Sequence, residues 1–194
     1  MDKSKKFIII RHGTTENNEK DKIRGWLDLP LSEEGIKEGH VTSKHVAKHD
    51  LDGMVSSDLL RARQTADIIS KDTGIPILEH NYGFRPWNLG ELTGMDVKAT
   101  LSTIKKYAEE TPDKPIPGGG ESFNEFKDRF LNALKDVFAH YKGKKLGIVA
   151  HHRSERLIDS LKPDGTVDFS KFSTKGISPS DVMEHDVDKV TGLK

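Results

Sequence analysis

The segment Phe7-Ile8-Ile9-Ile10-Arg11-His12-Gly13 changes within a few residues from wholly apolar to strongly polar. Its apolar part, residues 7–10, is short and mostly β-branched, which is typical of a strand buried on both faces of a sheet. Its polar part follows directly and must lie where that strand ends. The segment therefore predicts a buried parallel strand that brings an arginine and a histidine to one edge of the sheet.

Strand-like and helix-like patterns alternate along the rest of the chain. Further strands are expected at residues 54–57, 75–78 and 146–150, and helices at about 32–50, 58–71, 97–110 and 121–141. Asp58 is the expected cap of the second helix. Residues 81–94 and 112–120 are expected to be loops, and residues 178–183 a turn into an edge strand. This alternation predicts one α/β domain over residues 1–194, a three-layer αβα sandwich with a mostly parallel central sheet.

The composition excludes several classes of function. Lys plus Arg and Asp plus Glu both number 31, so neither nucleic-acid binding nor attachment to a membrane is expected. The absence of cysteine excludes disulfides, thiolate metal sites and a cysteine nucleophile. The apolar run at residues 7–10 is shorter than the roughly 7–15 residues of a signal-peptide core or the about 20 of a membrane span. We therefore expect a cytoplasmic protein.

Three polar motifs follow directly after predicted strands. They are Arg11-His12, the segment from Ser56 to Arg61, and His151-His152. In open parallel sheets, ligands bind along the edge formed by the carboxyl ends of the strands. Each motif alone is more often a surface feature than a catalyst. Their joint placement predicts a single crevice that contains two arginines and two histidines.

This set of side chains predicts an oxyanion ligand. The arginine fork matches pairs of phosphate oxygens, and a histidine with an unprotonated ring nitrogen can act as a nucleophile. A backbone carbonyl at the other ring nitrogen would fix that tautomer. Gly13 is expected to let the backbone approach the oxyanion closely. No metal or other cofactor is expected, because the arginines and the second histidine supply fixed positive charge.

The motifs resemble those of the histidine phosphatase superfamily, in the branch that includes cofactor-dependent phosphoglycerate mutase. The matching segments, in chain order, are Arg11-His12-Gly13-Thr14-Thr15-Glu16-Asn17-Asn18, Gly25-Trp26-Leu27-Asp28-Leu29-Pro30-Leu31-Ser32, Ser56-Ser57-Asp58-Leu59-Leu60-Arg61-Ala62-Arg63-Gln64-Thr65-Ala66, Pro117-Gly118-Gly119-Gly120-Glu121-Ser122 and Val149-Ala150-His151. The resemblance runs from Phe7 to about Leu161. It implies a phosphoglycerate mutase-like fold.

The resemblance also implies a role for individual residues. His12 would be the phosphorylated nucleophile, and the catalytic phosphate ligands would be Arg11, Arg61 and His151. Substrate-binding positions would be Asn18, Arg24, Gly25 and His152. Asn18 would hydrogen-bond a phosphate oxygen. Arg24 either holds a second acidic group of the substrate or is a plain surface arginine. The large residues His152-Arg153 stand where relatives have smaller ones, so they either narrow the pocket or contact the rest of the substrate.

One departure from the family pattern concerns the proton donor. The glutamate expected four residues before Gly90 is replaced by Pro86, which can neither donate nor accept a proton. Glu91 or Glu16 could serve instead as the general acid. The substrate could also have a leaving group that barely needs protonation, such as an acyl phosphate, phosphohistidine or an aryl phosphate. In a third interpretation catalysis is reduced and the domain is kept for binding.

The sequence therefore predicts an enzyme that hydrolyses phosphomonoesters through a phosphohistidine at His12. The substrate would be a phosphorylated small molecule or a phosphoprotein, and the sequence does not specify an oligomeric state. A phosphoglycerate mutase-like phosphotransferase is the weaker enzymatic alternative, because this short chain has no long closing segments. The non-enzymatic alternative is a phosphate-binding or protein-interaction module, which Pro86 favours.

Overall fold

The computed structural model describes residues 6–172, 178 and 182–192, and is built around a five-stranded sheet. The strands are β1 (Lys6–Arg11), β2 (Gly53–Ser57), β3 (Ile77–Asn81), β4 (Leu146–Ala150) and β5 (Val182–Asp186). Their order is β3-β2-β4-β1-β5, and only β5 runs antiparallel to its neighbour. The mostly parallel sheet and its C-terminal edge strand are confirmed. Residues 179–181 of the turn expected before β5 lie outside the described residues.

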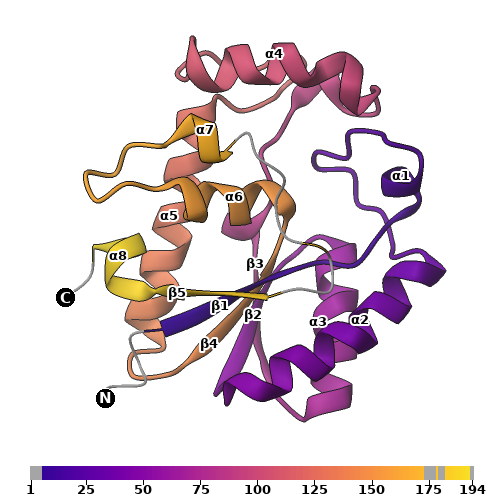
Figure 1. Cartoon of the computed structure of the whole chain (residues 1–194), viewed down its shortest axis with the longest axis vertical. Coiled ribbons are helices and arrows are strands. Elements are labelled where there is room, and N and C mark those ends of the chain that lie inside the picture. Colours follow the sequence, from indigo (N-terminus) through magenta and orange to yellow (C-terminus); the bar gives the residue numbers. More distant parts are fainter. Residues whose placement is uncertain (1–5, 173–177, 179–181, 193–194) are drawn as a thin grey trace.

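Helices cover both faces of the sheet (Figure 1). The helices of one face are α2 (Glu33–Val46) and α3 (Leu60–Thr73), and those of the other are α5 (Phe123–His140), α6 (His152–Ser160) and α8 (Val187–Thr191). The remaining helices are α1 (Glu16–Glu19), α4 (Val97–Glu109), which lies apart from both layers, and α7 (Phe169–Phe172). The predicted three-layer αβα sandwich is confirmed. In the described part of the chain, no helix is long and apolar enough to cross a membrane.

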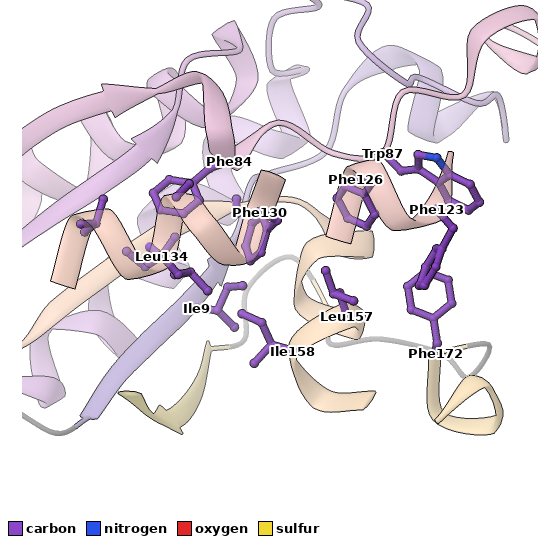
Figure 2. Packing of buried hydrophobic residues seen from close by; sticks show 14 of the residues in the cluster. Ile9, Phe84, Trp87, Phe123, Phe126, Phe130, Leu134, Leu157, Ile158 and Phe172 are labelled. Carbon is purple, nitrogen blue, oxygen red and sulfur yellow. The ribbon is translucent and has the colours of Figure 1, made fainter. Parts of the chain in front are cut away.

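Strand β1 is buried on both faces, as its apolar sequence predicts. Ile8 and Ile10 belong to the smaller core cluster, together with residues of α2 and α3. Phe7 and Ile9 belong to the larger cluster on the opposite face, which is rich in aromatic residues of α5 and of the loop before α4. Figure 2 shows part of this larger cluster around Phe126. This packing holds the end of β1, and the histidine that follows it, in a fixed position.

Two local predictions are wrong. Asp58 does not cap α3; the N-cap residue is Leu59, and the Asp58 carboxylate instead pairs with Arg85, with 2.8 and 2.7 Å between their atoms. The strand expected at residues 75–78 is displaced and begins at Ile77. Proline has no N–H to donate to a neighbouring strand, and Pro76 only accepts a hydrogen bond from Met54 before the ladder starts.

Candidate active site

The carboxyl ends of β1, β2 and β4 open onto one pocket, as the sequence predicts. Its walls include His12 after β1, Arg61 on α3 after β2, and His151 after β4. The backbone N–H of His12 donates to the carbonyl of Ala150 over 3.1 Å, which places the ends of β1 and β4 side by side. Three residues that are far apart in sequence therefore share one cavity.

His12 is held in one orientation and in one tautomer. The side chain is 3% exposed, and its Nδ1 lies 2.7 Å from the carbonyl oxygen of Gly13. A carbonyl only accepts, so Nδ1 must carry the proton. Nε2 accepts from Nε–H of Arg61 over 3.3 Å and is therefore unprotonated. Burial, reinforced by the Arg61 guanidinium, lowers the pKa of His12 well below its usual value. The carbonyl contact expected from the sequence is present, and Nε2 is the available nucleophilic atom.

Gly13 is required by a close contact with helix α2. A Cβ at Gly13 would lie 2.4 Å from the carbonyl oxygen of Gly35, and a Cβ at Gly35 would lie 2.0 Å from the carbonyl oxygen of Thr14. The two glycines therefore allow the loop after β1 to contact the first turn of α2. Thr65 of α3 also accepts the N–H of Gly13 over 3.1 Å. The close approach to Gly35 explains why this position cannot take a side chain, and the predicted approach to an oxyanion stays a prediction.

Arg61 is held by the loop that carries the Gly-Trp motif. It is 1% exposed, and its two terminal nitrogens donate to the carbonyls of Leu27 at 2.6 Å and Gly25 at 3.0 Å. Burial, together with the neighbouring Arg24, lowers its pKa to about 9. Arg61 is still charged at neutral pH. It presents a fixed cation next to Nε2 of His12.

His151 lies against His12 and has unused hydrogen-bonding capacity. The ring centroids are 5.0 Å apart and the side chain is 2% exposed. Neither ring nitrogen has a hydrogen-bond partner among the described residues. Buried polar atoms without a partner are rare and call for an explanation. A bound oxyanion would supply the missing partner, because any tautomer of the ring has an N–H to donate.

The remaining predicted site residues, which are the phosphate ligand Arg11 and the four substrate-binding positions, divide into two groups. Arg24, Gly25 and His152 line the pocket, which agrees with their predicted place. Arg11 and Asn18 do not form its wall. The Asn18 side-chain oxygen instead accepts from the backbone N–H and the hydroxyl of Thr15, at 3.0 and 2.9 Å, and so caps the short helix α1. Phosphate binding by Arg11 and Asn18 stays a prediction.

The described residues of the pocket wall include no carboxylic acid that could act as the proton donor. Pro86 lines it, and its carbonyl accepts from Nε1 of Trp26 at 2.8 Å and from Arg129 at 3.1 Å. Glu91 is exposed and outside the pocket wall, and Glu16 is an exposed partner of Lys20. The structure does not bring either carboxylate to His12. Of the described residues that line the pocket, none is an aspartate or a glutamate.

Basic residues that sequence reasoning missed complete the wall. Arg156 lies on α6, one turn beyond the predicted His152-Arg153 pair, and Lys22 lies in the loop after α1. Burial lowers the pKa of His152 to about 2 and that of Arg153 to about 10, with repulsion from neighbouring arginines adding to both shifts. Helix α6 was not expected from the sequence. In a helix, residues three apart lie on the same face, so a predicted helix here would have placed Arg156 beside Arg153.

Comparison with known proteins identifies the class to which this fold and site belong. The sequence matches the histidine phosphatase superfamily (branch 1) over residues 7–161. The chain therefore belongs to this superfamily.

Among its curated relatives are two proteins from Arabidopsis thaliana. A phosphoglycerate mutase-like protein is 31% identical over 150 residues, which cover 75% of this chain and 65% of the relative. A metal-independent phosphoserine phosphatase is 30% identical over 150 residues, covering 75% of this chain and 63% of the relative. The matches span slightly less than two thirds of both relatives. The relatives carry both phosphatase and mutase names.

A solved structure shows the same fold. The mycobacterial glucosyl-3-phosphoglycerate phosphatase, in a complex with VO3, superimposes with a TM-score of 0.76 at 22% identity. The match covers 93% of this chain and 92% of that one. The predicted phosphoglycerate mutase-like architecture is thus confirmed.

Proposed function

We propose that this protein is a phosphatase that hydrolyses phosphomonoesters through a phosphohistidine intermediate on His12, without a metal ion. The observation that carries the proposal is the state of the buried histidine pair. His12 has an unprotonated Nε2 beside the Arg61 guanidinium. His151 lies against it with both ring nitrogens lacking a partner among the described residues. A nucleophile, a fixed cation and an unused hydrogen-bond donor are the parts that phosphoryl transfer needs.

The reaction would proceed in two displacements. Nε2 of His12 attacks phosphorus, the bond from phosphorus to the ester oxygen breaks, and the electron pair leaves with that oxygen. Arg61 and an N–H of His151 bind the equatorial oxygens while negative charge shifts across them. Water then attacks the phosphohistidine, the bond from nitrogen to phosphorus breaks, and dihydrogen phosphate is released with neutral His12. The proton on Nδ1 remains hydrogen-bonded to the carbonyl of Gly13 throughout.

The names of the relatives favour a second candidate, a phosphoglycerate mutase-like phosphotransferase. A mutase uses the same phosphohistidine but returns the phosphate to the bound sugar acid instead of to water. Exchange between 2- and 3-phosphoglycerate therefore separates the two activities. A protein that binds phosphate without turning over any ester would instead be the binding module that Pro86 favours.

Hydrolysis of p-nitrophenyl phosphate between pH 4 and 8, in the presence of a metal chelator, tests the proposal. We expect turnover by the wild type and its loss in His12→Ala. The matched control is His140→Ala, which removes an exposed histidine at the end of α5 and should leave the rate unchanged. Acid quenching during turnover should trap a labelled phosphohistidine in the wild type. Turnover that survives in His12→Ala would disprove the proposed nucleophile.

A further inference from the structure

The pocket holds more positive charge than one phosphate group needs. His12, Arg61 and His151 form the part at the sheet edge. A second group, from the loop after α1 and from α6, consists of Lys22, Arg24, Arg153 and Arg156. We call these four residues the α6 cation group. They line the same cavity as His12, so they face whatever is attached to the transferring phosphate.

The α6 cation group is not neutralised by the protein. Within residues 6–172, 178 and 182–192, none of the four side chains makes an ion pair or a hydrogen bond, and Nε of Arg156 is buried without a partner. Arg24 and Arg153 are also repelled by neighbouring guanidinium groups, with no opposing carboxylate; burial and this repulsion lower the pKa of each to about 10. Only Arg156 is near a buried acid, Glu155, and that residue does not line the pocket. Partly buried charges without a partner are unfavourable, and they mark a place for an anion.

The lack of a carboxylic acid among the described residues of the pocket wall points to the nature of that anion. An alkoxide leaving group needs a proton from a general acid, and no described residue of the pocket wall is a carboxylic acid. A leaving group that is itself a phosphate needs no such proton, because its oxygens ionise with a second pKa of about 6. The same leaving group would carry the negative charge that the α6 cation group lacks.

We propose that the preferred substrate is a phosphoanhydride, in which His12 takes the terminal phosphoryl group while Arg153, Arg156, Lys22 and Arg24 hold the phosphate that departs. This inference rests on the phosphohistidine chemistry of the proposed function and extends it from phosphomonoesters to phosphoanhydrides. The bond from His12 Nε2 to phosphorus forms as the bond from phosphorus to the bridging oxygen breaks. The electron pair stays on the bridging oxygen, which becomes a terminal oxygen of the departing phosphate. Water then releases the transferred group as in the proposed mechanism.

Three probes test the inference: inorganic pyrophosphate as the phosphoanhydride, p-nitrophenyl phosphate, and glycerol 2-phosphate as an ester with an alcohol leaving group. In the wild type, we expect kcat/KM to be highest for pyrophosphate and lowest for glycerol 2-phosphate. The informative quantity is the ratio of kcat/KM for pyrophosphate to that for p-nitrophenyl phosphate. In Arg153→Met and Arg156→Met this ratio should fall by about 10- to 100-fold, the usual effect of losing a charged hydrogen bond.

The control is Arg63→Met, which removes an exposed arginine of α3 and should change neither rate. Turnover of p-nitrophenyl phosphate by each variant reports whether it has folded, and Arg153→Lys should recover part of the ratio because it restores the charge. The inference is overturned if the wild type hydrolyses p-nitrophenyl phosphate but prefers glycerol 2-phosphate to pyrophosphate. It is also overturned if the two methionine variants lower both rates equally. Failure of the wild type on every probe would instead refute the proposed function itself.

Discussion

The imidazole rings of His12 and His151 lie with their centroids 5.0 Å apart and their planes inclined by 62°. Both side chains are almost fully buried. Burial lowers the pKa of each ring well below its usual value, and the Arg61 guanidinium contributes to both shifts. The pair is therefore neutral at neutral pH, which leaves Nε2 of His12 unprotonated for attack on phosphorus.

These pKa shifts predict how stability depends on pH. In the unfolded chain the two histidines bind protons near their ordinary pKa of about 6.5, whereas in the folded protein they do so only at lower pH. The unfolded state thus binds more protons below about pH 6.5. The free energy of unfolding should fall there as pH decreases, by up to about 1.4 kcal/mol per pH unit for each histidine. Urea denaturation from pH 7.5 to 5 measures this slope.

Variants of the two buried histidines test whether these residues cause the change of the free energy of unfolding with pH. His12→Asn and His151→Asn should each make the decline between pH 6.5 and 5 shallower, because asparagine does not titrate. His140→Asn, at an exposed position, should leave the slope as it is in the wild type. An unchanged slope in both active-site variants would show that the buried pair does not remain neutral in the folded protein.

The loop that carries Pro86 depends on Arg129 of α5. The Arg129 guanidinium donates to the carbonyls of Gly83, Arg85 and Pro86 at 2.8 to 3.1 Å, and pairs with both carboxylate oxygens of Glu121. It is 15% exposed. Arg129→Met keeps much of the apolar packing but removes the side-chain donor to the carbonyls of Gly83 and Arg85, and leaves the Pro86 carbonyl only its bond from Trp26. We expect the free energy of unfolding to fall by roughly 2–3 kcal/mol, measured by urea denaturation.

The Arg85–Asp58 pair provides a comparison for Arg129. Two nitrogens of the Arg85 guanidinium donate to the carboxylate of Asp58. The Arg85 side chain is 25% exposed, and among the described residues it donates to no backbone carbonyl. Arg85→Met should therefore cost less, about 1 kcal/mol or under. An equal loss of stability in the two variants would mean that the carbonyl contacts of Arg129 contribute little.

The strands and the main site residues were predictable because they depend on local sequence. The buried strands β1, β2 and β4 are short runs of mostly apolar residues; His12 and His151 follow the ends of β1 and β4 directly, and Arg61 follows β2 within the first turn of α3. Helix α6 was not predictable from the sequence. Its segment begins with His152-Arg153 and lacks a clear apolar repeat over its short length. Asp58 pairs with Arg85 instead of capping α3. This contact joins residues 27 positions apart, so the local sequence pattern does not predict it.

The contact between the β1 loop and α2 is testable with two glycines of the same helix. Gly35→Ala would place Cβ 2.0 Å from the backbone oxygen of Thr14, which cannot move without shifting the loop of His12. We expect a loss of about 1–3 kcal/mol in the free energy of unfolding, despite the better helix propensity of alanine. In Gly39→Ala the nearest atoms to the added Cβ belong to the side chain of Ile68, and the flexible end of that side chain lies 3.0 Å away. That variant should stay within about 1 kcal/mol of the wild type. Thermal and urea unfolding of both check this, and equal stabilities would argue against the close contact.

Pro86 stands where the family resemblance places the proton donor. Pro86 lines the pocket, and its hydrogen bonds to Trp26 and Arg129 use only its carbonyl, which any residue retains. Pro86→Glu should therefore add a carboxyl group to the pocket wall. A general acid is worth about 100- to 10,000-fold for a leaving group that needs protonation. We expect kcat for glycerol 2-phosphate to rise by at least about tenfold, allowing for imperfect placement.

The two comparison substrates make this result specific. Nitrophenolate and phosphate leave without a proton, so p-nitrophenyl phosphate and pyrophosphate should gain little from Pro86→Glu. Added negative charge near the α6 cation group should also raise KM for pyrophosphate, because the new carboxylate competes for the same cations. Pro86→Gln, which has a similar shape but no acidic proton, should not accelerate glycerol 2-phosphate. Equal acceleration by glutamine and glutamate would mean that removal of the proline ring, and not proton donation, limits the reaction.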